Sequence, residues 1–403
     1  MNSPYKAPSS PVGENRSDTR ALSPSPARVV YVVSNNLAKV SSLLPSNKNR
    51  SVLVHTLVKQ YGLLDVANPQ SARPIHPVPA TVEELTRYHS RQYIDFVLDP
   101  YNFSKQDDAI PSSTHAEFGI QEDCPAFAGL HKYIPLVAGA TLTAANSLIK
   151  GEADISICWD GGRHHAQKSK ASGFCYVADC VLAILALKRD RINTLGLPPH
   201  KSRVMYLDLD LHFSDGVSQA FVSPGGPGSG EPQVLTLSIH HASPGFFPVS
   251  ALSSLSDPTE ESFDPFTLSL PLARGASDAT FARMWKSVEA VKHAFQPDYV
   301  VVQCGVDGLA GDSYAVWNWS LGSSEGSLSW CVNRICRTWQ CKTLLLGGGG
   351  YNHPNVARAW THLTSVAVCS FSSSIATGTV LVSNRSLKSS QVLSAKEALL
   401  TKL

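Results

Sequence analysis

The chain has 403 residues, of which 43% are hydrophobic and 16% are charged, and its net charge is +2. This composition predicts a globular protein that is long enough to bury a large core. Such a small net charge gives no general attraction to nucleic acid or to a membrane surface. The nine cysteines form no C-x-x-C pair, which argues against a disulfide framework and a zinc ribbon and favours a reducing compartment. No apolar run has the length of a bilayer span, and no signal peptide is evident.

Regular structure is expected to begin after the first 27 residues. Residues 1–27 are rich in proline and serine, which predicts a disordered tail. The β-branched and aromatic run from Arg28 to Val33 predicts the first strand. Further apolar strands are predicted at Ala153 to Trp159, Arg203 to Leu209, Val234 to Ile239, Tyr299 to Cys304 and Thr343 to Leu346.

Helical patterns lie between these strands and are clearest at Tyr133 to Leu148 and Val177 to Lys188. Strands that are nearly continuous apolar runs and alternate with helices are typical of a sheet buried on both faces. We therefore predict an α/β fold with a single open, mostly parallel β-sheet between layers of helices. The segment from Gly225 to Pro232 is expected to be a surface loop, and it lacks the Gly-Lys-Ser/Thr ending of a phosphate loop.

One short run, Val204 to His212, holds an apolar strand followed by alternating polar residues. If the strand alternation persists, Asp208, Asp210 and His212 lie on the same side. Two carboxylates and an imidazole in an apolar setting are costly unless something compensates them. A divalent metal would do so, and mixed oxygen and nitrogen ligands suit zinc. The alternative is a buried carboxylate network that holds the histidine in a structural turn.

Polar residues also follow three other predicted strands, at the positions where open α/β sheets bind ligands. They are Asp160 to His165, Gly305 to Gly308 and Gly347 to Asn352. Adjacent histidines are often incidental, and Asp307 could be an ordinary turn residue or the third ligand that leaves a catalytic zinc one open position. The four glycines could form a flexible turn or a tight one that aims Tyr351 at a neighbour.

Several segments together resemble the zinc-dependent histone deacetylases, in the order and spacing of the class I branch. They are Trp159 to Ala166, Ala171 to Tyr176, Tyr206 to His212, Ser243 to Pro248 and Leu346 to Asn352. The resemblance covers roughly residues 28–370 and leaves 371–403 as an atypical tail. It implies the arginase/deacetylase fold and the removal of acetyl groups from lysine side chains.

The resemblance also implies a role for individual residues. Carried over by position, the zinc ligands are Asp210, His212 and Asp307, and the catalytic group comprises His164, His165, Asp208, Asp215 and Tyr351. Phe174 and Phe247 match the walls of an acyl-lysine tunnel, Gly173 the backbone beside it, and Asp123 and Tyr314 its rim. Arg50 resembles the arginine of an inner channel behind the metal, an exit route for acetate. The family also binds potassium, at one site through main-chain oxygens of Asp208, Asp210 and His212 with Ser238.

The chemistry of these groups agrees with the resemblance. Zinc would polarise the acetyl carbonyl and acidify a water molecule. We expect His165 to act as general base and then as general acid toward the lysine amine, with His164 as an electrostatic partner. Tyr351 would help to stabilise the oxyanion. A neutral acetamide suits an aromatic slot, whereas a charged lysine would pay for desolvation there.

The chain departs from the family pattern at four places. Phe213 replaces a second histidine, although that position is not a ligand. Arg163 replaces an apolar or proline residue and is expected to add positive charge near the mouth of the tunnel. Tyr314 replaces a leucine or methionine and is expected to narrow that mouth or to change its selectivity. The segment after Ser370 lacks the family's Tyr-Gly-Pro motif, which bears on stability more than on chemistry.

The resemblance further predicts partners, a location and alternatives. Acetylated histone tails or other acetyl-lysine proteins are the expected substrates, corepressor subunits are expected partners, and the nucleus is the expected location, with the cytoplasm as a second one. A hydrolase of acetylpolyamines or other small amides is the first alternative. A catalytically impaired scaffold is the second. A binuclear manganese hydrolase of the arginase type would need further ligands, which Phe213 and Ser214 do not supply.

Overall fold

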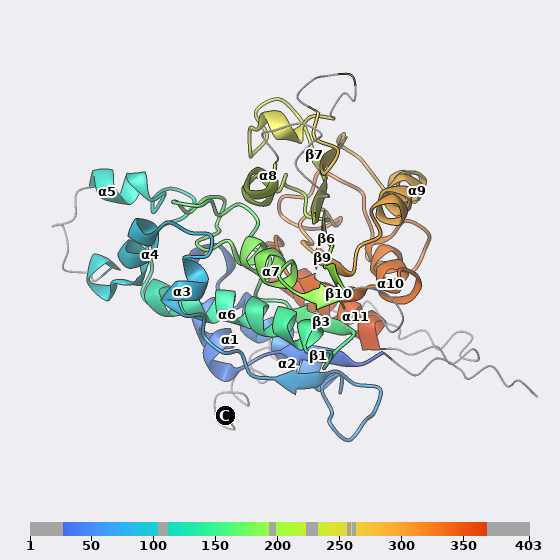
Figure 1. Ribbon diagram of the computed structural model, residues 1–403, viewed down its shortest axis with the longest axis horizontal. Coiled ribbons are helices and arrows are strands. Elements are labelled where there is room, and N and C mark those ends of the chain that lie inside the picture. The colour runs from blue at the N-terminus through green and yellow to red at the C-terminus, as the bar shows by residue number, and fades with distance from the viewer. Residues whose placement is uncertain are drawn as a thin grey trace, which may run out of the picture.

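The computed structural model describes residues 27–103, 112–192, 199–222, 233–255, 259 and 263–368. Residues 1–26 of the predicted tail at 1–27, the predicted tail at 371–403 and the predicted loop from Gly225 to Pro232 lie outside the described residues. The described part is built around one sheet with helices on both faces (Figure 1).

The sheet has eight strands in the order β2-β1-β3-β10-β9-β6-β7-β8, and every pairing in it is parallel. Its strands are β1 (Val29–Val32), β2 (Arg73–Ile75), β3 (Ile155–Cys158), β6 (Val204–Asp208), β7 (Val234–His241), β8 (Thr267–Leu272), β9 (Tyr299–Gln303) and β10 (Lys342–Leu346). The short β4 (Arg191–Ile192) and β5 (His200–Lys201) form a separate antiparallel pair. The predicted α/β fold with a single open parallel sheet is confirmed.

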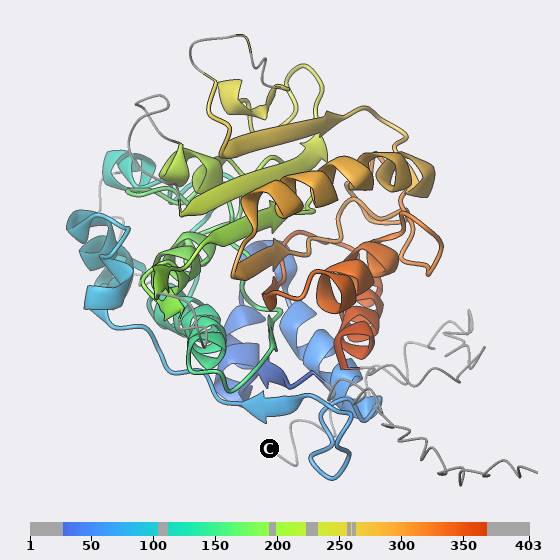
Figure 2. The same ribbon diagram turned by 45° about the vertical axis from the view of Figure 1, so that its right-hand side comes forward.

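Eleven helices surround this sheet in the described residues. They are α1 (Asn35–Ser41), α2 (Arg50–Gln60), α3 (Val82–Leu85), α4 (Arg91–Leu98), α5 (Ser112–Glu117), α6 (Leu130–Ile149), α7 (Asp179–Leu187), α8 (Asp215–Phe221), α9 (Asp278–Phe295), α10 (Leu328–Thr338) and α11 (His353–Val368). Helices α1, α4, α6 and α7 share one hydrophobic core, and α2, α9, α10 and α11 share a second core. Figure 2 shows α9, α10 and α11 on the opposite side of the strands from α6 and α7.

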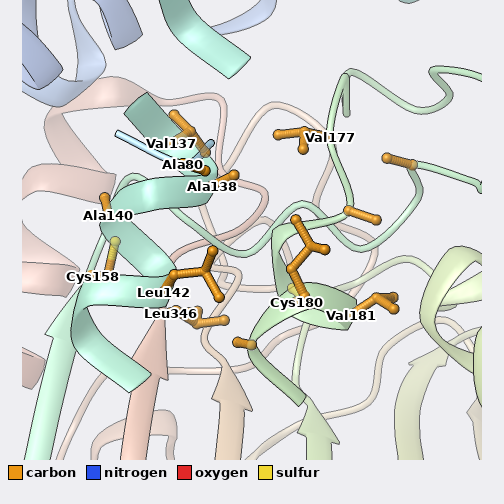
Figure 3. Packing of buried hydrophobic residues seen from close by; sticks show 14 of the residues in the cluster. Ala80, Val137, Ala138, Ala140, Leu142, Cys158, Val177, Cys180, Val181 and Leu346 are labelled. Atoms are coloured by element: carbon orange, nitrogen blue, oxygen red, sulfur yellow. The ribbon is translucent and has the colours of Figure 1, made fainter. Parts of the chain in front are cut away.

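The two cores lie on opposite faces of the sheet because neighbouring strand residues point in opposite directions. In β1, Val30 belongs to the core of α6 and α7, whereas Tyr31 belongs to the other core. In β6, Tyr206 belongs to the core of α6 and α7, and Leu207 belongs to the other core. Figure 3 shows side chains of α6 and α7 packed beside Leu346 at the end of β10. Strands buried on both sides produce the continuous apolar runs from which the fold class was predicted.

The sequence pattern missed the two edge strands, β2 and β8. Each contains a proline, Pro74 in β2 and Pro271 in β8, and each is paired on one side only. Proline removes a donor from the ladder, so it is tolerated at a sheet edge and weakens the pattern of a strand. None of the helices in the described ranges is both long enough and apolar enough to cross a membrane.

Candidate active site

The four strands followed by polar residues, β3, β10, β9 and β6, are direct neighbours in the sheet. Because these strands are parallel, their carboxyl ends meet at one edge. The four segments that are far apart in the sequence therefore converge there, as the sequence analysis predicted.

Two buried histidine–carboxylate pairs lie at this edge. The Nδ1 atom of His164 lies 2.8 Å from Asp208 Oδ2, and that of His165 lies 2.7 Å from Asp215 Oδ1. The two imidazole rings are adjacent, with centroids 3.9 Å apart. Against the effect of burial, Asp208 and Asp210 raise the pKa of His164 to about 9. Burial and the neighbouring His164 lower the pKa of His165. The structure therefore gives the two histidines different proton affinities.

A second cluster consists of Asp210, His212 and Asp307, whose ligand atoms lie within 4.8 Å of one another. His212 Nδ1 is 2.9 Å from Asp307 Oδ2 and 3.3 Å from Asp210 Oδ1. Burial and the nearby Asp210 raise the pKa of Asp307 to about 6. Despite burial, hydrogen bonds to both carboxylates raise the pKa of His212 to about 10. Two carboxylates and one imidazole, drawn together in a buried setting, are a donor set that fits a zinc ion.

The glycine loop at 347–350 passes directly over this cluster. Gly349 N donates to Asp210 Oδ2 at 2.7 Å. A Cβ atom on Gly349 would lie 2.2 Å from Asp307 Oδ2, so a side chain is excluded there. The run is therefore a closely packed loop, which argues against the flexible turn that was one of the two interpretations left open by the sequence.

Tyr351 directly follows the glycine loop, and its ring lies between two other aromatic rings. Its ring centroid is 5.8 Å from that of Phe174 and 4.6 Å from that of Tyr314. Burial raises the pKa of Tyr351 well above its usual range. The hydroxyl group therefore keeps its proton at neutral pH and can donate a hydrogen bond.

Aromatic side chains and one carboxylate lie near His165, toward the solvent. Phe247 is 41% exposed and its ring lies 4.9 Å from His165. A Cβ atom on Gly173 would lie 2.4 Å from His165 Cδ2, so this position requires glycine. Asp123 accepts a hydrogen bond from Gly173 N at 2.7 Å. Tyr314 is 52% exposed, and its ring contacts that of Tyr351.

A small internal cavity lies on the other side of the glycine loop, and both Arg50 and Arg163 line it. The expectation that Arg163 adds positive charge near the tunnel mouth is wrong. Its side chain is only 5% exposed and donates to the carbonyl oxygen of Asp160 at 2.9 Å. The reason is that the backbone N–H group of Arg163 donates to the buried Asp179 at 2.7 Å, which fixes the backbone direction at this residue.

Arg50 is also buried and holds the glycine loop from this side. Its guanidinium donates to the carbonyl oxygen of Gly350 at 2.8 Å and lies 4.9 Å from the ring centroid of Trp360. Burial and the charge of Arg163 lower the pKa of Arg50 to about 10.

Sequence reasoning missed three residues that contact the site. Gln303 donates to Asp210 Oδ2 at 2.8 Å, and Phe246 stacks on His212 at a centroid distance of 5.2 Å. Asp312 accepts hydrogen bonds from Tyr351 N and Asn352 N at 2.7 and 2.9 Å. A lone glutamine that ends the apolar run of β9 was a usable signal for the first of them. Phe213, in contrast, is buried against His240, with ring centroids 4.8 Å apart.

The parallel sheet, with an Asp-His-Asp cluster and two histidine–carboxylate pairs at its carboxyl edge, defines a hydrolase of the arginase/deacetylase superfamily. Residues 44–367 match the family model of the histone deacetylase domain. The chain is 38% identical over 344 residues to histone deacetylase 8 of Danio rerio, covering 84% of this chain and 82% of that protein.

Two further relatives have the same domain. Probable histone deacetylase 1-B of Xenopus laevis is 36% identical over 327 residues, which are 80% of this chain and 61% of the relative. Histone deacetylase 2 of Oryza sativa is 39% identical over 326 residues, which are 80% and 58%. The chain belongs to the histone deacetylase family, in its class I branch, and is a hydrolytic lysine deacetylase.

Proposed function

We propose that this chain is a zinc-dependent enzyme that hydrolyses the acetyl amide of N6-acetyl-lysine in histones or other proteins. One observation supports it most: the Asp-His-Asp cluster and both histidine–carboxylate pairs converge at the carboxyl ends of four adjacent strands. Asp210, His212 and Asp307 would hold the zinc ion. A bound zinc ion supplies Lewis-acid polarisation of the substrate carbonyl and of a water molecule.

Substrate binding is assigned to the aromatic rings and to the rim. Phe174 and Phe247 flank the apolar stem of the acetyl-lysine side chain, beside the backbone of Gly173. Asp123 and Tyr314 contact the peptide around the mouth. Aromatic rings suit a neutral acetamide because it gives up little hydration there, whereas the free lysine product is charged and leaves.

Proton transfer is assigned to His165. Its Nδ1 is 2.7 Å from Asp215, so Nε2 is the nitrogen that faces the reaction. His165 takes a proton from the attacking water as the new C–O bond forms. The C–N bond then breaks, and the proton passes to the amine nitrogen, which gives acetate and lysine. The O–H group of Tyr351 donates to the carbonyl oxygen as negative charge develops on it. His164, held by Asp208, contributes an electrostatic interaction.

Three finer assignments belong to the same proposal. Residues 28–370 form the catalytic domain. A structural potassium ion binds main-chain oxygens of Asp208, Asp210 and His212 near Ser238, which pairs with Asp208 across β6 and β7. The enzyme works in the nucleus on acetylated histone tails, in company with corepressor subunits.

Zinc content measured alongside the turnover of an acetylated histone-tail peptide tests this function. We expect one zinc ion per chain and release of acetate from the peptide, with acetylspermidine hydrolysed more slowly in a parallel assay. A zinc-loaded preparation without activity on acetyl-lysine would contradict the assignment as an enzyme. Faster turnover of acetylspermidine would contradict the choice of substrate.

A further inference from the structure

One carboxylate ties together the two loops that present Tyr314 and Tyr351. Asp312 Oδ2 accepts from Tyr351 N at 2.7 Å and from Asn352 N at 2.9 Å, and Asp312 Oδ1 accepts from Tyr314 N at 3.1 Å. We name this arrangement of one carboxylate and three amides the Asp312 clamp. Asp312 and Tyr351 are 39 positions apart in the sequence, so their contact is tertiary, whereas the bond from Tyr314 N to Asp312 is local.

Neighbouring contacts restrain the same junction. Asn352 Nδ2 and Asn355 Nδ2 both donate to the carbonyl oxygen of Gly311, at 3.2 and 3.1 Å. Asn352 precedes α11, and its carbonyl oxygen accepts from Val356 N at 3.0 Å. The loop around Gly311 is therefore fixed against the start of a long helix, and the Asp312 clamp is part of that fixed junction.

The Asp312 clamp acts on the residue whose hydroxyl must be placed accurately. Tyr351 follows four consecutive glycines, whose backbone is intrinsically permissive. The clamp holds its amide group, and the ring of Tyr314 packs edge-on against its ring at 4.6 Å. Hydrogen bonds to a charged acceptor are stronger than those between neutral groups. One carboxylate thus restrains both the backbone and the ring neighbour of Tyr351.

We propose that Asp312 is a positioning residue that holds the Tyr351 hydroxyl in its productive orientation. This inference rests on the proposed function, because it concerns the same site. Asp312 contacts only the backbone amide of Tyr351. It therefore affects the reaction indirectly, by fixing where the tyrosine hydroxyl lies. A misplacement of about 1 Å can cost up to about 100-fold in rate, so loosening the clamp should reduce kcat even when every catalytic group is present.

The test uses the full chain with zinc bound and compares Asp312→Asn with Asp312→Ala. Asparagine keeps one oxygen acceptor, whereas alanine releases all three amides. We expect Asp312→Asn to lower kcat about 10-fold and Asp312→Ala to lower it further, each with KM changed less than about twofold and zinc content unchanged. If Asp312→Ala does not fold, Asp312→Asn still tests the inference.

A double-mutant cycle separates positioning from a general loss of structure. In the background of Tyr351→Phe, which has no hydroxyl to place, Asp312→Asn should change the remaining kcat less than about twofold. An effect as large as in the parent would overturn the inference, and so would an unchanged kcat in Asp312→Asn alone. A parent enzyme that binds zinc and has no turnover would instead contradict the proposed function.

The matched control is Asp278→Asn. The Asp278 carboxylate also accepts three hydrogen bonds from a loop, from Ser320 N, Ser320 Oγ and Ser324 Oγ at 2.8, 2.6 and 2.9 Å. It is partly buried, as Asp312 is, and it has no contact with Tyr351. We expect this variant to keep kcat within about twofold of the parent at a comparable loss of thermal stability. A tenfold loss of kcat in Asp278→Asn would overturn the specific link between Asp312 and Tyr351.

Discussion

The two sides of the glycine loop hold different charged groups. On one side lie the carboxylates of Asp210 and Asp307, and on the other side lie the guanidinium groups of Arg50 and Arg163, with the carboxylate of Asp160 beside them. The backbone of the loop presents an N–H group to the acidic side, where Gly349 N donates to Asp210. It presents a carbonyl oxygen to the arginine side, where the Gly350 carbonyl oxygen accepts from Arg50. The backbone direction of two residues is thus complementary to both charged regions.

The two regions differ in how their charge is compensated. Arg50 and Arg163 donate to backbone carbonyl oxygens, and Arg50 also faces the ring of Trp360. On the acidic side, the carboxylates of Asp210 and Asp307 lie close to the single imidazole of His212, and burial raises the pKa of Asp307. On the arginine side, carbonyl oxygens and the Trp360 ring face the guanidinium groups, although Arg163 Nε is buried without a hydrogen-bond partner among the described residues. The acidic side is arranged as a receptor for a cation.

The largest effect is expected from Asp307→Ala. It removes one proposed ligand from the acidic side and leaves a site with two, so zinc and turnover should be lost together. Metal analysis and the peptide assay measure both quantities. Asp307 Oδ1 also accepts from Leu211 N at 3.0 Å, so Asp307→Asn, which can keep this bond, checks that the loss does not come from misfolding. Full activity in either zinc-depleted variant would contradict the assignment.

Tyr351→Phe should leave the charge of both sides unchanged and act on the reaction alone. Removal of one oxyanion donor typically lowers kcat by about 10²–10³-fold. Zinc content is expected to stay at the level of the parent, and the peptide assay gives the rate. A parental rate in this variant would remove Tyr351 from the mechanism.

Zinc itself should stabilise the folded chain, because it relieves the repulsion on the acidic side. At a concentration 100 times its Kd, a ligand that binds only the folded state adds about 2.7 kcal/mol to the free energy of unfolding. Urea unfolding with zinc and with a chelator measures this difference. Asp307→Ala is the control, and an equal response to zinc in that variant would place the binding elsewhere.

Arg50→Met tests the arginine side, where the smallest effect is expected. The change leaves the Gly350 carbonyl oxygen buried without its donor, at a cost of about 1–3 kcal/mol in the free energy of unfolding. Zinc content should not change, because Arg50 does not touch the acidic cluster. Urea unfolding and metal analysis check both outcomes, and loss of zinc in this variant would show that the two sides are not independent.

Sequence patterns predicted the parts of the site that depend on local order. Asp208 ends one strand and Asp210 and His212 follow it directly, and Asp160 to His165 follow another strand, so both groups stand out in the sequence. The glycine run allowed a flexible turn or a tight one, and the structure shows that Asp307 leaves no room for a side chain at Gly349. The fold class was predictable for the same reason, since central strands are apolar on both faces and leave a clear pattern.

Contacts between distant segments were not predictable from these patterns. Gln303 reaches Asp210 across 93 positions, and nothing near either residue indicates the pairing. The inward direction of Arg163 depends on Asp179, 16 positions away, and a charged residue beside a loop is otherwise expected to face water. The edge strands β2 and β8 were hidden because an edge tolerates proline and needs no continuous apolar run.

The place of β10 in the sheet has a consequence for folding. This strand, the last in the described chain, lies between β3 and β9 and pairs Thr343 with Ile155. The centre of the sheet therefore closes only after nearly all of the domain has been synthesised. Until then β3 presents an unpaired edge, which is a template for association with other chains. Contacts of such long sequence separation form slowly. We therefore expect the nascent protein to be prone to aggregation until its catalytic edge is assembled.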